Sequence, residues 1–302
     1  MRNFLFCTTA VVFCLFFTPA SAQQQILTPI LASDANFRDL AGISASNGGT
    51  GFVNTTSNNG VMRTGIFYRS QALSTLTSAD KESLSTLHIG LDIDLRTPRE
   101  IIGTPSLLDP NAGIDWLPNG TDYLNVNIYG TVDPPSTGSV NSPETAVDYM
   151  KSTYQNFVTD PFQRAKFHEV LLALASEADA AVFHCSGGKD RTGWTAMLLQ
   201  SIAGVSPSTI MDDYLASNSY MAAAINDILD KVPAEERATF AVMLGVQSEF
   251  LQAGLDQVTV SYGSLDAYLT QGLGLSQETI YLLRNKMVCY NSLVPALTLI
   301  LL

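Results

Sequence analysis

The chain has 302 residues, and its 16 lysines and arginines against 28 aspartates and glutamates give a formal net charge of −12. This acidic excess argues against general affinity for nucleic acid, so an anionic ligand would need a local positive site. The length suits one large domain, or one domain with an insertion. Two of the four cysteines, Cys7 and Cys14, lie in an N-terminal segment that is expected to be removed, and the remaining Cys185 and Cys289 imply no disulfide framework.

The first 22 residues have the composition of a secretory signal peptide. Arg2 provides a basic start, residues 4–17 form an apolar run, and Ala20-Ser-Ala22 has the small residues of a cleavage site. The segment is too short to span a membrane comfortably, and an uncleaved N-terminal anchor is the alternative. We therefore expect a secreted or periplasmic protein without a stable membrane anchor.

Downstream, hydrophobic periodicity alternates between strands and helices. A helix is expected from about residue 79 to 87, because Thr77 and Asp80 have the spacing of a capping box. The alternation indicates an α/β fold in which helices flank a central sheet. The other expected elements are strands at 66–69, 91–95, 126–128 and 180–183, and helices at 144–157, 162–175 and 194–201.

Two polar stretches interrupt this pattern. Residues 44–60 are rich in Gly, Asn, Ser and Thr and predict a surface loop or a hairpin insertion. Residues 130–140 predict a longer connection, which is either a plain surface crossover or a mobile flap over a site. Residues 289–302 form an apolar tail of unknown role, for which docking on the protein body is expected rather than membrane anchoring.

The segment His184-Cys-Ser-Gly-Gly-Lys-Asp-Arg-Thr-Gly193 lies where an expected strand passes into an expected helix. The N–H groups of the helix's first turn and its dipole favour an anion held in this loop. Gly187 and Gly188 allow the backbone from Ser186 to Lys189 to form a nest of N–H donors. A cysteine and an arginine six positions apart therefore indicate a phosphate site that carries its own nucleophile.

Several polar residues of this loop have an expected role. The positive field favours the thiolate of Cys185, which is the nucleophile, and the planar fork of Arg191 can hold two phosphoryl oxygens. Thr192 could donate its hydroxyl to the sulfur, and His184 is expected to orient the loop through hydrogen bonds. Lys189 suits a substrate with more than one phosphate, the alternative being a solvated loop lysine.

The loop resembles the signature of the cysteine-dependent phosphatases, and its Gly-Lys-Asp-Arg-Thr-Gly ending is similar to an atypical bacterial branch of tyrosine and lipid phosphatases. Ala41 departs from that branch, which usually has glycine there. The resemblance implies a cysteine-phosphatase-like fold, with a phosphatase domain at 23–288 and a helical, lid-like insert at 207–255. It rests also on blocks in the same order at residues 35–42, 67–73, 92–100, 262–268 and 273–280.

The resemblance implies a phosphomonoester hydrolase that acts on phosphotyrosine, on phosphoinositides or on both. Inositol polyphosphates are an alternative substrate class, and a catalytically idle phosphate-binding module is an alternative function. Arg38 and Arg96 are the upstream arginines that the resemblance favours for substrate binding; surface charges or partners of nearby carboxylates are the alternative. No cofactor is implied, and the three histidines form no metal-ligand cluster with the cysteines, so zinc is not expected.

Hydrolysis through a phosphocysteine needs a carboxylic acid that protonates the leaving oxygen. The resemblance implies Asp190, inside the loop, as this acid. An aspartate at a helix N-terminus is also favoured by the dipole without any role in catalysis. Asp133, in the proline-containing connection, is the alternative acid, as in tyrosine phosphatases that carry it on a mobile loop.

Overall fold

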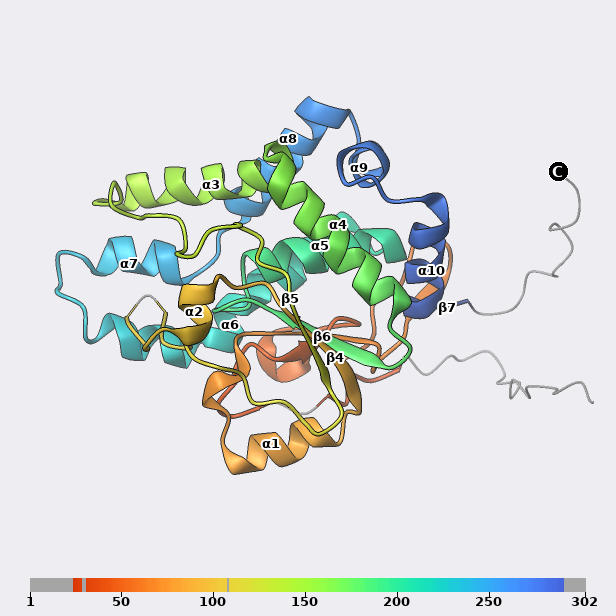
Figure 1. Cartoon of the computed structure of the whole chain (residues 1–302), viewed down its shortest axis with the longest axis horizontal. Helices are drawn as coiled ribbons and strands as arrows, with labels where there is room; N and C mark the ends of the chain where they lie inside the picture. The colour runs from red at the N-terminus through yellow and green to blue at the C-terminus, as the bar shows by residue number, and fades with distance from the viewer. Residues whose placement is uncertain (1–23, 29–30, 108, 291–302) are drawn as a thin grey trace, which may run out of the picture.

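The computed structural model describes residues 24–28, 31–107 and 109–290 (Figure 1). The expected signal peptide and residues 291–302 of the expected tail lie outside the described residues. Among the helices of the described part, none is both long enough and apolar enough to cross a membrane.

A five-stranded sheet forms the centre of the fold. The register places Ser70, His184 and Asp94 side by side, so the carboxyl ends of three parallel strands meet at one edge. In α/β sheets this edge is where ligands commonly bind. The strand order is β1 (Arg38–Asp39), β3 (Phe67–Ser70), β6 (Ala180–His184), β4 (Ile89–Asp94) and β5 (Asp122–Asn125), all parallel to their neighbours except β1.

Helices cover both faces of this sheet, because successive residues of its buried strands face opposite layers. Phe183 packs into the larger core on one face, whereas Val182 packs with Tyr68 and Leu84 on the other. Leu84 belongs to α1 (Ser78–Ser85), which lies below the sheet in Figure 1, while α4 (Pro161–Ser176) and α5 (Arg191–Ala203) lie above it. The expected α/β fold with a central sheet flanked by helices is confirmed.

The larger layer is built around one almost completely buried helix, α5 (Arg191–Ala203), which begins directly after the cysteine loop. Two further helices, α6 (Pro207–Leu229) and α7 (Arg237–Leu244), reach the left end of the molecule in Figure 1 and make up much of the expected helical insert. The remaining helices of this layer are α3 (Pro143–Thr159), α4 (Pro161–Ser176), α8 (Ser248–Tyr262), α9 (Leu265–Ala267) and α10 (Gln277–Met287), with a π-helical turn, η3 (Tyr268–Gly272).

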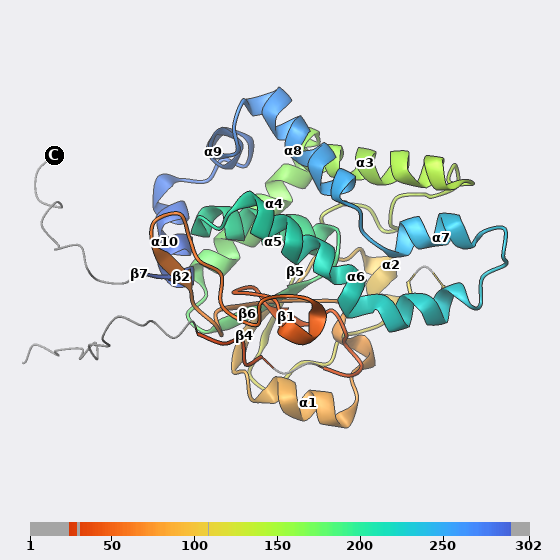
Figure 2. The ribbon, with the colours of Figure 1, turned by 180° about the vertical axis from the view of Figure 1, so that it is seen from behind.

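A small second sheet pairs β2 (Gly60–Met62) with β7 (Val288–Tyr290), seen from behind in Figure 2. Cys289 and Tyr290, expected in the tail, therefore belong to the folded body. The stretch at 44–60 is a loop with a short helical turn, η1 (Ala45–Asn47), and two other short elements are η2 (Leu73–Thr75) and α2 (Pro98–Ile102). The connection at 130–140 contains no helix or strand.

Two local predictions were wrong. Thr77 caps α1 by accepting from the Asp80 N–H (3.2 Å), but the reciprocal bond of a capping box is absent, because the Asp80 carboxylate accepts from the backbone of Ala32 and Ser33 instead. The strand expected at 126–128 lies earlier, in β5. Its neighbour β4 ends opposite Asn125, so no strand continues beside the following residues.

Candidate active site

The cysteine loop joins β6 to α5 at the carboxyl edge of the sheet, and its backbone is held from outside. Gly188 has φ +67°, and a Cβ there would meet the Ser70 carbonyl oxygen at 2.2 Å, so the turn requires glycine. Gly187 has no such requirement, since a Cβ there would meet its nearest neighbours at 3.8 Å. The geometry thus requires glycine at Gly188 and leaves room for a Cβ at Gly187.

Three side chains hold the loop's carbonyl groups. Asn111 donates to the carbonyl of residue 186 (3.2 Å), Asn36 to that of residue 187 (2.9 Å) and Arg69 to that of residue 188 (3.0 Å). Among the described residues, the N–H groups of 186–189 have no hydrogen-bond partner. These N–H groups are therefore available to bind the anion that is expected in the loop.

The loop forms the floor of a cavity of about 690 Å³. Cys185 and Arg191 line this floor, and both are almost fully buried. A second hollow of similar size, lined in part by Thr28 and Asp39, contains no residue of the loop, so the chemistry belongs to the first. Ser186, Gly187, Lys189 and Asp190 also line the first cavity.

Arg191 is held by a carboxylate that the sequence did not single out. Its NH1 and NH2 groups donate to the two oxygens of Glu100 at 2.9 and 2.5 Å, and its guanidinium lies 4.7 Å from the centre of the Tyr129 ring. Burial opposes both charges, but the pair raises the pKa of Arg191 well above its usual value and lowers that of Glu100 to about 2. The pair with Glu100 uses the edge of the guanidinium between NH1 and NH2, and it leaves the edge that carries Nε for a phosphoryl group.

Asp190 lies at the start of α5, yet its side chain does not cap that helix. One oxygen accepts from the Tyr154 hydroxyl (3.0 Å) and the other from Lys189 Nζ (2.7 Å). Asp133, the alternative acid, is about two-thirds exposed and pairs with Arg99 at 2.8 Å. The structure therefore brings Asp190 to the cavity of Cys185 and leaves Asp133 outside its lining.

Thr192 does not make the expected bond to the cysteine. Its hydroxyl is buried and has no hydrogen-bond partner within the described part of the chain. The hydroxyl of Ser186 instead donates to Glu100 (2.8 Å), which adds a third contact to the carboxylate that orients Arg191.

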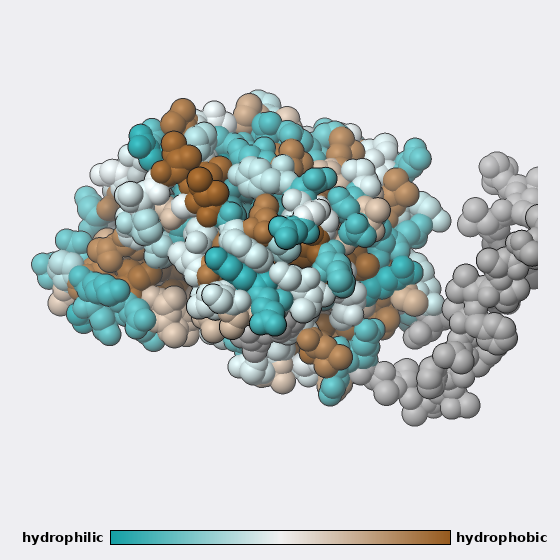
Figure 3. Space-filling view, turned by 60° about the horizontal axis from the view of Figure 1, so that its bottom comes forward, coloured by the Kyte–Doolittle hydropathy of each residue, from teal (hydrophilic) through white to brown (hydrophobic). Residues whose placement is uncertain are grey.

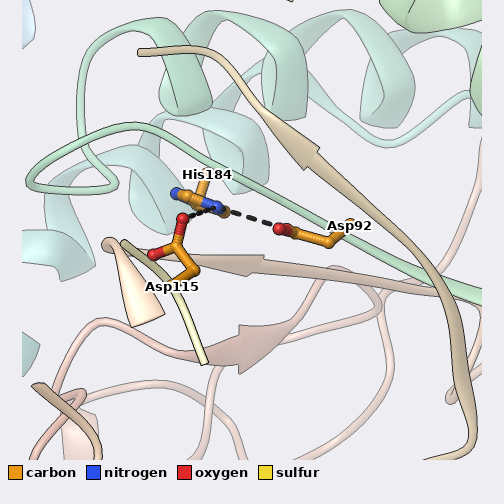
Figure 4. A group of neighbouring side chains, drawn as sticks. All are labelled: Asp92, Asp115 and His184. Carbon is orange, nitrogen blue, oxygen red and sulfur yellow. Dashed lines mark ion pairs between the residues drawn. The ribbon is translucent and has the colours of Figure 1, made fainter. Parts of the chain in front are cut away.

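His184 lies beneath the loop in a buried cluster of charges (Figure 4). Nδ1 is 3.2 Å from the carbonyl oxygen of Cys185, and Nε2 is 3.2 Å from Asp92 and 3.6 Å from Asp115. Burial opposes the imidazolium, but Asp92, Asp115 and Asp94 together raise the pKa of His184 to about 10. The doubly protonated ring can then hold the backbone at the nucleophile.

Asp92, Asp115 and His184 have the spacing of a metal site, since their ligand atoms lie within 4.8 Å of one another. Their chemistry does not fit a cation. The charged ring of His184 has no lone pair to offer, and Asp115 is also paired with the buried guanidinium of Arg96. Two cations, His184 and Arg96, already face the carboxylates of this group, so we interpret it as an internal ion-pair cluster.

The structure places Arg38 and Arg96 behind the site, where neither lines the cavity. Arg96 pairs with Asp94 at 2.8 Å and is fully buried. Arg38 pairs with Asp213 of α6 at 2.9 Å and donates to Asn36 at 2.6 Å. Since Asn36 in turn holds the loop, Arg38 supports the phosphate cradle from behind, and direct substrate contact by either arginine finds no support in this geometry.

Sequence reasoning missed three kinds of site residue. Glu100 had a local signal, because Thr97-Pro-Arg-Glu100 is a capping box with proline at the first helical position. Asn36 lies in the resembling block at 35–42 but had no role assigned to it, and Asn111 had no signal, since only the fold brings these two residues to the loop. Tyr154 has the spacing of a core residue on an amphipathic helix, so its buried hydroxyl gave no sign of a polar role.

Comparison with known proteins agrees with the site. The triple specificity protein phosphatase PtpB of Mycobacterium tuberculosis is 29% identical over 280 residues, which cover 83% of this chain and 95% of that protein. A tyrosine-protein phosphatase of Nostoc commune is 29% identical over 238 residues, covering 73% and 74% of the two chains. Residues 30–289 match the tyrosine phosphatase family, a span that includes the cysteine loop and nearly the whole described fold. The chain therefore belongs to the tyrosine phosphatase family, as a protein-tyrosine phosphatase.

Proposed function

We propose that the chain hydrolyses phosphomonoesters through a phosphocysteine intermediate. The thiolate of Cys185 attacks phosphorus, so an S–P bond forms as the ester P–O bond breaks. The loop N–H groups and Arg191 stabilise charge on the non-bridging oxygens, while Asp190 gives its proton to the leaving oxygen. Water then attacks the phosphocysteine, its proton passes to Asp190, and phosphate leaves the regenerated thiolate.

The observation that carries this proposal is the arrangement of Cys185, Arg191 and Asp190 around one cavity floor. The nucleophile lies at the carboxyl edge of the sheet, next to loop N–H groups that have no partner among the described residues, and the Asp190 carboxylate does not cap its helix. An idle phosphate-binding module would need the donors but neither the thiol nor the carboxylate.

The walls of the cavity support phosphotyrosine and phosphoinositides as substrates. Apolar side chains of the insert line the wall contributed by α6 and α7, and in Figure 3 hydrophobic residues gather at the left end of the molecule, where these helices lie in Figure 1. A tyrosine ring or a lipid body can use such a wall, whereas an inositol polyphosphate cannot. The wall is lined by Met221, Ala224, Ile225, Ile228, Met243 and Leu244.

The test is turnover by residues 23–302 with a phosphotyrosine peptide, phosphoinositide vesicles and an inositol polyphosphate, together with the variant Cys185→Ser. We expect turnover of the first two substrates, a phosphoenzyme that rapid acid quench and mass spectrometry locate on Cys185, and no turnover by the variant despite retained oxyanion binding. Turnover by Cys185→Ser at the wild-type rate would exclude covalent catalysis. Equal use of the inositol polyphosphate would favour the alternative substrate class.

We also propose that the protein is exported, as the composition of its first 22 residues suggests. Expression of the full chain in a bacterial host, followed by fractionation and mass spectrometry of its N-terminus, tests this. We expect a periplasmic or secreted product that begins at Gln23; a cytoplasmic product that retains Met1 would contradict export.

A further inference from the structure

Asp190 has a buried hydrogen-bond donor that lies outside the cysteine loop. The hydroxyl of Tyr154, on α3, is 3.0 Å from Asp190 Oδ1 and 2.8 Å from the hydroxyl of Tyr214, on α6. Both tyrosines are almost fully buried. Two helices distant in sequence therefore supply a pair of phenols behind the carboxylate proposed as the acid.

The ring of Tyr154 is fixed by aromatic neighbours. It packs edge-on against Trp194 at a centroid distance of 6.3 Å and against Tyr214 at 6.0 Å, and it is tilted against Phe157 at 5.3 Å. Contacts of this kind leave a buried side chain little rotational freedom. The direction in which the hydroxyl points is thus set by the core rather than by the loop.

The direction of the hydrogen bonds follows from the number of protons. Each phenol has one proton. Asp190 Oδ1 accepts whether the carboxyl group is ionised or carries its proton on Oδ2, so Tyr154 donates to Asp190 and Tyr214 donates to Tyr154. Burial, reinforced by the charge of Asp190, raises the pKa of both Tyr154 and Tyr214 well above the usual value. Both phenols therefore remain protonated and available as donors.

We propose that Tyr154, supported by Tyr214, is a positioning residue that holds the Asp190 carboxyl group toward the leaving oxygen. The other donor to Asp190, Lys189, is a flexible chain in the cavity lining whose ammonium a substrate phosphate can attract. Tyr154 cannot move in this way, so it keeps Oδ1 fixed, while Oδ2 is paired with Lys189, which lines the cavity. The inference rests on the proposed function, in which Asp190 is the acid.

The test compares Tyr154→Phe with Tyr268→Phe. The control removes a hydroxyl from another fully buried tyrosine that packs against Trp194, but its hydroxyl donates to the Phe157 carbonyl and not to Asp190. Tyr154→Phe should lower kcat on an alkyl phosphate about tenfold or more, the scale of a lost hydrogen bond to a charged group, with KM unchanged. On an activated aryl phosphate, whose leaving group needs no acid, kcat should change less than about threefold. Tyr268→Phe should leave both values near wild type.

Two further variants complete the test. In an Asp190→Asn background, Tyr154→Phe should have no additional effect on the alkyl phosphate, because the two residues act through one group. Tyr214→Phe should lower kcat by a smaller factor, again more on the alkyl phosphate than on the aryl phosphate. It replaces Tyr154→Phe in the test if circular dichroism shows that Tyr154→Phe folds poorly.

An equal loss on both substrates, or a full additional loss in the Asp190→Asn background, would overturn the positioning role. Failure of the premise is distinguishable, because Asp190→Asn alone would then lack the alkyl preference. If Asp190→Asn shows that preference and neither tyrosine variant does, Asp190 remains the acid and the inference about Tyr154 is wrong.

Discussion

Gly188 is the residue at which the backbone geometry of the phosphate loop can be tested most directly. Gly188→Ala places a Cβ 2.2 Å from the Ser70 carbonyl oxygen at a φ of +67°, so the loop must shift. We expect kcat/KM to fall at least about tenfold, together with weaker oxyanion binding and a loss of stability of about 1–3 kcal/mol. Steady-state kinetics, calorimetry with a competitive oxyanion and urea unfolding measure these effects.

Gly187→Ala is the matched control. Its Cβ would make ordinary contacts at 3.8 Å, and the backbone there does not require a positive φ. We expect the oxyanion affinity to stay within about twofold of wild type and the free energy of unfolding to stay within about 0.5 kcal/mol. Similar losses in both variants would show that the loop tolerates no side chain for reasons other than the contact at Ser70.

Lys189 tests substrate choice. Lys189→Ala should lower kcat/KM on phosphoinositide vesicles more than on a phosphotyrosine peptide, because a second phosphate loses a charge-assisted contact worth roughly 1.5 to 3 kcal/mol if desolvated. The variant also removes the 2.7 Å contact to Asp190, an effect that both substrates share. The informative quantity is therefore the ratio of the two values at equal ionic strength. An unchanged ratio would assign Lys189 to the loop in general.

At the scale of elements, the longer helices and strands were predictable because each is a local pattern. The helices at 144–157 and 162–175 and the strand before Cys185 were confirmed, since apolar spacing and buried runs are properties of contiguous residues. The two-residue β1 and the pair β2 and β7 carry too few residues to show a period. Such elements exist because the fold supplies their partners.

The site shows the same difference between residues that a local pattern reveals and residues that only the fold brings together. Cys185, Asp190 and Arg191 are contiguous enough to be recognised in sequence. Arg38 and Arg96 were expected to contact substrate because of the family resemblance, but the structure shows the alternative, in which each pairs with a buried carboxylate. Which side of a loop an arginine occupies depends on tertiary packing.

Glu100 of helix α2 both caps its own helix and orients Arg191. Glu100 caps this helix by accepting from the Thr97 N–H (2.8 Å) and also holds Arg191 through both carboxyl oxygens. Glu100→Gln keeps the shape but removes the charge, so the fork loses its orienting partner. We expect kcat to fall about tenfold, whereas oxyanion affinity should not weaken, because a nearby negative charge is removed. Kinetics and calorimetry separate the two effects.

Asp133→Asn is the control for Glu100→Gln. It breaks the ion pair with Arg99, which lies one residue before Glu100, but both side chains of that pair are about two-thirds exposed. Such pairs contribute little, so kcat and oxyanion affinity should be unchanged. A selective loss on alkyl phosphates in Asp133→Asn would instead move the acid assignment to Asp133.

At the scale of the whole molecule, the buried charges beneath the loop couple stability to pH. The pKa of His184 is about 10 in the folded chain against an ordinary value of 6.5, so the folded state binds an extra proton between these limits. The contribution of His184 to the free energy of unfolding is complete below pH 6.5 and is lost as the pH rises toward 10. Burial also raises the pKa of Asp34 to about 7 and of Asp115 to about 6, which makes stability fall with rising pH at lower values.

Urea unfolding between pH 7.5 and 9 isolates the contribution of His184 from these two carboxyl groups. We expect the free energy of unfolding of the wild type to fall by a few kcal/mol at most over this window. Asp92→Asn removes a carboxylate 3.2 Å from Nε2, so it should lower stability at pH 7.5 and flatten the decline. Glu169→Gln, which breaks a half-exposed pair with Lys166, should keep the wild-type slope. The groups remote from His184 are common to all three proteins. An equal slope in Asp92→Asn and wild type would therefore mean that His184 is not held as an imidazolium. The buried cluster beneath Cys185 would then need another source of positive charge.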